Sequence, residues 1–88
     1  MDDSLLLIEE ARACAGLFRL GRDVEAALSM VDLFDRIAPL FATAPDDVQQ
    51  QWGLLVMEIF SRQQLQDWLG VADYLMYELE ALIGQGKW

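Results

Sequence analysis

The sequence predicts an all-α protein, a four-helix up-down bundle that folds as one domain over residues 1–88. Apolar residues recur along the chain with a period near 3.6 residues, and strict alternation is nowhere sustained. The formal net charge is -9, yet 55% of the residues are hydrophobic, whereas disordered acidic chains have few hydrophobic residues. Short polar connections favour antiparallel neighbours, so two αα-hairpins form the bundle. A short helical-repeat-like pair of hairpins is the alternative. The predicted helices are residues 4–20, 23–42, 44–62 and 67–83.

The first two predicted helices form the first hairpin. Ser4 is a favoured N-cap residue of the first helix, and Gly21 is a favoured terminator. Asp23 suits the N-cap of the second helix, and Pro39 should kink or end that helix because proline lacks the amide hydrogen. Each helix has an apolar stripe that predicts its buried face. The stripes are Leu7, Ala11, Cys14 and Phe18 in the first helix and Val24, Ala27, Leu28, Val31, Phe34 and Ala38 in the second.

The last two predicted helices form the second hairpin. Thr43 and Asp46 have the spacing of a capping box ahead of the third helix, and Pro45 suits its first turn. Asp67 can cap the fourth helix. The hairpins are related by a weak internal repeat that aligns Phe18 with Phe60, or they are similar by chance. One core should join them and bury Leu28, Val31, Leu55, Ile59, Leu75 and Leu79.

The residue types that catalysis needs are scarce. The chain has no histidine, which is the commonest general base near neutral pH and the commonest metal ligand. The single cysteine, Cys14, lies in the middle of a helix on an apolar stripe, with no neighbour to activate it. No glycine-rich phosphate-binding motif occurs. We therefore expect no catalytic, cofactor-binding or metal-binding residues and a protein that is not an enzyme.

The number of cysteines and the net charge limit the cellular compartments and the kinds of partner that suit this chain. A single cysteine cannot form an internal disulfide, which favours the cytoplasm. Fifteen acidic residues against six basic residues disfavour nucleic acid and anionic membrane surfaces as ligands. No apolar run approaches the length that spans a bilayer.

The fourth predicted helix is acidic without basic neighbours in sequence. Between Gln63 and Gln85 the chain has four acidic residues and no Lys or Arg. Two of them lie in the last turns, where the helix dipole prefers cations. Together with two tyrosines, acids opposite the apolar stripe indicate a surface that docks onto a basic protein partner, or else a face that only aids solubility. The expected partner-binding residues are Asp73, Tyr74, Tyr77, Glu78 and Glu80.

In size, acidity and helical build the chain is similar to the immunity proteins that neutralise basic nuclease toxins and to some secretion chaperones. The similarity lies in gross properties and extends to no motif. It implies a small non-enzymatic protein that inhibits or protects a basic partner protein by binding it.

The third predicted helix is apolar on nearly every side. Between Trp52 and Phe60, Glu58 is the only charged residue. A helix that is apolar all round has to be covered. Within the same chain, the residues that can cover it are Leu5, Leu6 and Trp88. The alternative function is a structural homodimer that associates through this helix, with Leu54 and Met57 at the contact.

Overall fold

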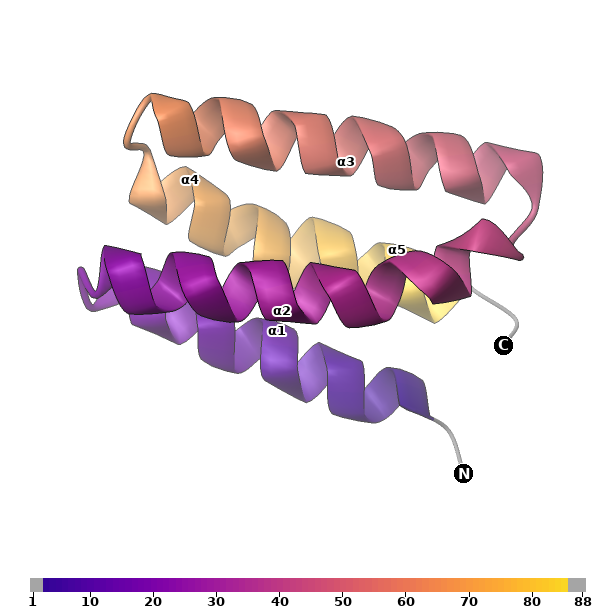
Figure 1. Ribbon diagram of the computed structural model, residues 1–88, viewed down its shortest axis with the longest axis horizontal. Helices are drawn as coiled ribbons and strands as arrows, with labels where there is room; N and C mark the ends of the chain where they lie inside the picture. Colours follow the sequence, from indigo (N-terminus) through magenta and orange to yellow (C-terminus); the bar gives the residue numbers. More distant parts are fainter. Residues whose placement is uncertain (1–2, 86–88) are drawn as a thin grey trace.

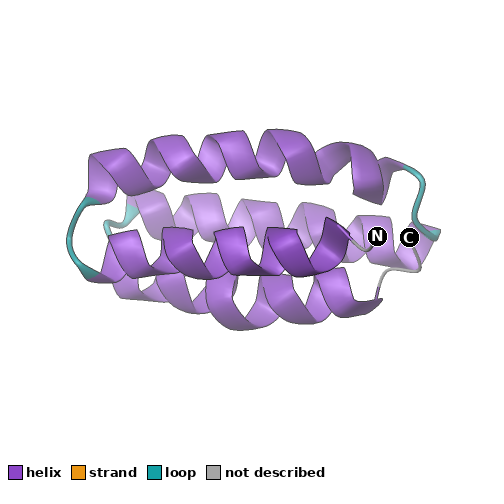
Figure 2. Ribbon diagram, turned by 90° about the horizontal axis from the view of Figure 1, so that it is seen from below, coloured by secondary structure: helices purple, strands orange, loops and turns teal. Residues whose placement is uncertain are grey.

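The computed structural model describes residues 3–85 and is an all-α four-helix bundle of 34 × 26 × 19 Å (Figure 1). Consecutive helices run in opposite directions, so α1 begins and α5 ends at the same end of the bundle (Figures 1 and 2). The last helix, called the fourth helix below, is a continuous helix of three parts, α4, η1 and α5. The elements are α1 (Asp3–Arg19), α2 (Asp23–Ala42), α3 (Asp46–Gln64), α4 (Trp68–Asp73), η1 (Tyr74–Glu78) and α5 (Leu79–Gln85).

The helices surround the core in the order of the sequence. α1 packs against α2 and against the fourth helix, and α3 packs against the fourth helix and α2. α1 and α3 therefore lie diagonally across the bundle, as do α2 and the fourth helix. This order determines which charged side chains can meet between helices.

Most of the predicted core is confirmed. The α1 stripe of Leu7, Ala11, Cys14 and Phe18 is buried, and so are Leu55, Ile59, Leu75 and Leu79. The prediction was wrong for Leu28 and Val31, whose exposed fractions are 69% and 52%. The core is therefore built from the predicted faces of α1, α3 and the fourth helix and from a different face of α2.

The predicted apolar stripe of α2 is wrong because this helix has two stripes with the same spacing. The buried stripe contains Ala26, Met30, Leu33, Phe34, Ile37 and Phe41. Of the predicted stripe, Phe34 is buried and Ala27 is half-buried, whereas Val24, Leu28, Val31 and Ala38 are exposed. The next turn of the exposed stripe contains the acidic residue Asp35, and the buried stripe continues with apolar residues. α2 also continues past Pro39, which therefore does not end it.

α2 and α3 meet through aromatic rings. Phe41 stacks on Trp52 with ring centroids 4.8 Å apart. Phe34 makes edge contacts with Trp52 at 5.3 Å and with Phe60 at 6.2 Å. Such pairs contribute about 0.5 to 1.5 kcal/mol each beyond the burial of their area.

Gly21 stops the first helix, as predicted, and α1 ends at Arg19. The φ of Gly21 is 75° and lies in the left-handed region that glycine adopts without strain. The Gly21 N–H donates to the carbonyl of Phe18, and the Arg22 N–H donates to the carbonyl of Leu17, which is the Schellman arrangement. The same arrangement recurs at Gln66, whose φ is 58°.

The two turns show how the hairpins correspond. Matching Gly21 with Gln66 places Phe18 opposite Gln63 and not opposite Phe60. Phe18 is buried, whereas Phe60 is exposed. The alignment of Phe18 with Phe60 is therefore wrong, and the likeness of the two hairpins lies in their turns.

Two of the predicted helix starts are also wrong. Ser4 lies inside α1, which begins at Asp3. Asp23 is the first residue of α2, and the N-cap position is taken by Arg22, whose side chain makes no capping hydrogen bond. Helix starts are weakly specified by sequence because several neighbouring polar residues suit the same position.

The predicted capping box ahead of α3 is absent. Thr43 ends α2, and its hydroxyl donates to the carbonyl of Leu40 at 3.2 Å, so it is not available to α3. Pro45, and not Thr43, is the N-cap, and Asp46 is the first helical residue. The Gln49 side-chain amide instead donates to two carbonyls at the end of α2 and in the loop.

Asp67 caps the fourth helix, as predicted. One carboxylate oxygen accepts a hydrogen bond from the Gly70 N–H at 3.0 Å, and the other lies 3.1 Å from Arg62 Nη1. Asp67→Ala should therefore lower the free energy of unfolding by about 1 kcal/mol, measured by urea denaturation. Asp35→Ala, which removes an exposed acid that makes no ion pair with residues 3–85, is the control and should change it by less than about 0.5 kcal/mol. Equal effects of the two substitutions would contradict this role of Asp67.

Candidate functional site

Arginines of α1 neutralise two of the acids predicted to bind a partner. Arg12 Nη2 lies 2.6 Å from Glu80 Oε1, and Arg19 Nη2 lies 3.1 Å from Asp73 Oδ1. The expectation that these acids lack basic partners is therefore wrong. The expectation was based only on bases that are near in sequence. α1 packs beside the fourth helix and brings arginines that are distant in the chain close to these acids.

The positive charge of the described residues is fully used in ion pairs. Each arginine between residues 4 and 85 has at least one carboxylate within 3.1 Å. The i, i+4 pairs of Arg36 with Asp32 and of Arg62 with Glu58 are present, as the sequence predicts. Over the same residues, the acids that have no ion pair are Glu9, Asp23, Asp35, Asp46, Asp47 and Glu78. The uncompensated surface charge of this part of the chain is negative.

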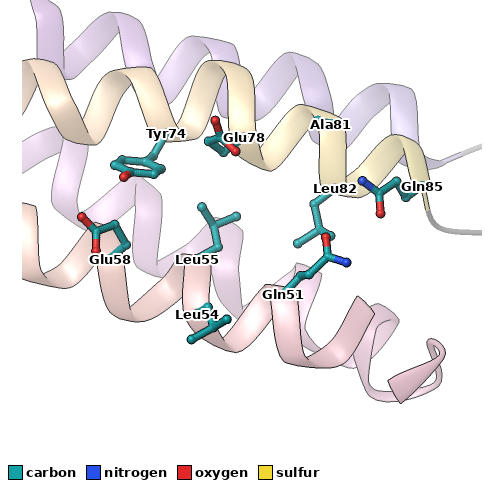
Figure 3. A pocket seen from close by; sticks show the side chains of 9 residues that line it. All are labelled: Gln51, Leu54, Leu55, Glu58, Tyr74, Glu78, Ala81, Leu82 and Gln85. Atoms are coloured by element: carbon teal, nitrogen blue, oxygen red, sulfur yellow. The ribbon is translucent and has the colours of Figure 1, made fainter. Parts of the chain in front are cut away.

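One of these acids, Glu78, lies in a groove between α3 and the C-terminal half of the fourth helix (Figure 3). The groove has a volume of about 410 Å³. Leu55 projects from α3 towards the fourth helix, and Leu82 projects from α5 towards α3. Both leucines are buried, so they form an apolar floor. Leu54 is exposed and lines the outer edge of the groove on α3.

The groove is acidic. Its lining includes the carboxylates of Glu58 and Glu78 and, among residues 3–85, contains no Lys or Arg. Glu58 is compensated because its Oε1 accepts a hydrogen bond from Arg62 Nε at 3.1 Å. Glu78 is exposed and makes no ion pair with the described residues. A cation that enters the groove therefore meets one free carboxylate and one that is shared.

Arg62 stands at the end of this groove and positions Tyr74. Its guanidinium carbon lies 5.9 Å from the centre of the Tyr74 ring, within the range of a cation–π interaction. Hydrogen bonds to Glu58 and then to Asp67 and Tyr74 raise the pKa of Arg62. The side chain stays charged under all ordinary conditions and fixes the tyrosine beside the acidic groove.

The fourth helix contributes to the groove through a π-helical turn. η1 spans Tyr74–Glu78, and the Leu79 N–H donates to the Tyr74 carbonyl. Leu75 and Leu79 are buried, while Tyr74 and Glu78 line the groove (Figure 3). Single π turns inside α-helices are rare and are found frequently at functional sites. The sequence does not predict this turn, because the spacing of the apolar residues through it fits an ordinary α-helix.

The five predicted partner-binding residues divide between two sides of the fourth helix. Tyr74 and Glu78 line the groove towards α3. Asp73 and Glu80 bind the arginines of α1, and the exposed Tyr77 lies beside Glu80 at a second hollow on that side. The groove residues that the sequence analysis did not select for partner binding are Gln51, Leu54, Leu55, Glu58, Ala81, Leu82 and Gln85. The predicted antiparallel pairing of the last two helices could have indicated that residues of α3 line this side of the fourth helix.

Neither leucine expected to cover α3 does so. Leu5 and Leu6 are exposed on α1, which lies diagonally across the bundle from α3. Trp88, the other residue expected to cover it, lies outside the described residues. Leu54 and Met57 are both exposed on α3, and so is Phe60.

Cys14 is held in the core as a neutral thiol. Its Sγ donates a weak hydrogen bond to the carbonyl of Ala26 at 3.4 Å. Burial raises the pKa of the Cys14 thiol to about 11, so the nucleophilic thiolate is not formed near neutral pH. Among residues 3–85 no three His, Cys, Asp or Glu side chains are grouped to hold a metal ion. Over the same part of the chain no helix has both the length and the apolar character to cross a membrane.

No protein-family model, curated protein or solved structure matches this chain. The groove, its charge and the exposed apolar residues therefore carry the functional argument by themselves.

Proposed function

We propose that the protein is a non-enzymatic binding module that holds a basic amphipathic helix of a partner protein in the groove between α3 and the fourth helix. The observation that carries this proposal is the lining of the groove, which combines an apolar floor with two carboxylates and, within the part of the chain that the structure describes, no base. Glu78 has no ion pair with the described residues, so a Lys or Arg of the partner would gain an interaction without breaking one.

A helix is the ligand that suits this shape. The groove runs between two helices, and an amphipathic helix places apolar residues along such a groove at i, i+3, i+4 and i+7. Its apolar face would cover Leu55 and Leu82. Basic residues beside that face would reach Glu58 and Glu78. Tyr74 would supply a rigid aromatic contact, of a type enriched at protein interfaces.

The α1 side of the fourth helix is less suited to a basic partner. Asp73 and Glu80 already bind arginines there, and a partner's cation would have to displace Arg19 or Arg12. The proposal therefore narrows the predicted acidic surface to Tyr74 and Glu78 and adds Glu58. An immunity-type inhibitor of a basic toxin and a secretion chaperone, each acting in the cytoplasm, are the two biological roles that such a module would fill.

Glu78→Lys should weaken the binding of a basic helix by about tenfold or more, because it places a like charge against the partner's cations. The probe is a basic amphipathic helical peptide selected by phage display against the parent protein, and its affinity is measured by isothermal titration calorimetry. Asp35→Lys is the matched control, since Asp35 is also exposed and makes no ion pair with the described residues but lies on α2. It should retain nearly the parental affinity.

Two results would contradict the proposal. One is the selection of no basic helix by the parent protein from a library rich in such sequences. The other is an equal loss of affinity in Glu78→Lys and Asp35→Lys, which would show that only the net charge of the chain attracts the peptide.

A further inference from the structure

The outer face of α3 is uncharged and combines large apolar side chains with glutamines and small residues. Every exposed residue of α3 between Gln49 and Gln64 is uncharged. Three large apolar side chains are exposed on it, and the most exposed, Met57, has 69% of its surface accessible. The other two are Leu54 and Phe60. This face lies outside the acidic groove, with Leu54 at the boundary between the two.

The charge of the chain restricts what can cover this face. Two copies that each carry a formal charge of -9 repel one another wherever uncompensated acids meet. A basic partner would gain no ion pair on the outer face of α3. A second copy, by contrast, brings an equally uncharged α3 surface to the contact.

The spacing of the apolar residues is self-complementary. Leu54 and Phe60 are equally far from Met57 in sequence, one on each side. An antiparallel pairing of two α3 helices about a twofold axis at Met57 would place Leu54 of each copy opposite Phe60 of the other. Twofold interfaces require such self-complementarity, because the same patch serves on both copies. The neighbouring Gly53 and Ser61 are small and allow a close approach of the helices.

A contact through α3 alone would be too small for a stable dimer, so the proposed interface includes part of α2. The outer strip of α3 is about 28 Å long and about 10 Å wide and so covers roughly 300 Å². A stable interface takes about 600 to 1,000 Å² from each partner. Phe60 reaches α2 through its contact with Phe34, and Val31 lies one turn away from Phe34 on that helix. The exposed α2 residues that continue the apolar surface are Val24, Leu28 and Val31.

From these observations we infer that a second copy of this chain docks antiparallel on the outer face of α3, with the twofold axis at Met57 and with the exposed apolar stripe of α2 at the flank. The interface explains why α2 has two apolar stripes. One faces the core of its own chain, and the other faces the second copy. This dimer would cover Leu54 at the outer edge of the groove, whereas Leu55, Leu82 and Glu78 lie outside the proposed contact.

Sedimentation equilibrium tests the dimer. The parent protein should be a dimer at about 10 µM, and Met57→Glu should yield a folded monomer, because it would bury two carboxylates against each other. Leu69→Glu is the matched control, since Leu69 is exposed to a similar extent on α4, and it should remain dimeric. Circular dichroism shows whether each variant is folded. A parent protein that is monomeric at about 100 µM, or a folded Met57→Glu variant that stays dimeric, would overturn the inference.

Disulfide trapping tests the position of the axis without disrupting the face. Met57→Cys should form a covalent dimer under mild oxidation, because residues at a twofold axis bring their Cα atoms within about 7 Å. Leu69→Cys should not, and the buried Cys14 is protected in both variants. Trapping of Leu69→Cys at an equal rate would show that the covalent dimers come from random collisions and would overturn the proposed axis.

Discussion

Phe41→Ala should lower the free energy of unfolding by about 3 to 5 kcal/mol, which is a large part of the stability of a domain of this size. The Phe41 side chain is buried, and its ring stacks on Trp52 with a centroid distance of 4.8 Å. Trp52 is also held by Phe34, so it cannot move freely into the space that the substitution leaves. Urea denaturation followed by circular dichroism measures the loss.

Phe60→Ala is the control of the same residue type. Phe60 is exposed, and its ring contacts Phe34 at the longer distance of 6.2 Å. Measured in a monomeric background such as Met57→Glu, Phe60→Ala should lower the free energy of unfolding by less than half as much as Phe41→Ala does. Equal losses would contradict the assignment of Phe41 to the centre of the α2–α3 contact.

Ile59→Ala is the second large effect that we expect, with a loss of about 2 to 5 kcal/mol. Ile59 is a fully buried residue of α3 and forms part of the core. Leu28→Ala is the informative comparison, because Leu28 belongs to the exposed stripe of α2. Measured in the monomeric Met57→Glu background, it should change the free energy of unfolding by no more than about 0.5 kcal/mol.

The comparison of Ile59 with Leu28 decides the orientation of α2. A loss above about 2 kcal/mol for Leu28→Ala in the monomer would mean that α2 buries the stripe containing Leu28 and Val31. A small loss for Ile59→Ala would contradict the core itself.

Much of the fold could be predicted from the sequence, because local signals specify it. The apolar stripe of α1, the stop at Gly21 and the cap at Asp67 each depend on a few neighbouring residues, and all three are present in the structure. The face of α2 could not be decided by periodicity alone, since two stripes share one spacing. The acidic Asp35 in the exposed stripe was the signal that separates them.

The candidate site depended on packing, and less of it could be predicted. The sequence identified Tyr74 and Glu78, which line the groove, but it grouped them with Asp73 and Glu80. Those two acids are neutralised by arginines of α1, a pairing that follows from the order of helices around the core. The π turn at η1 adds a change of register that no apolar pattern indicated.

The central claim is that the groove between α3 and the fourth helix binds a basic helix. Intermolecular nuclear Overhauser effects between the isotope-labelled protein and an unlabelled selected peptide test it most directly. We expect contacts from the apolar side chains of the peptide to the methyl groups of Leu82 and to the ring of Tyr74. Contacts to the exposed residues of α1 or α2, with none to Leu82 and Tyr74, would contradict it.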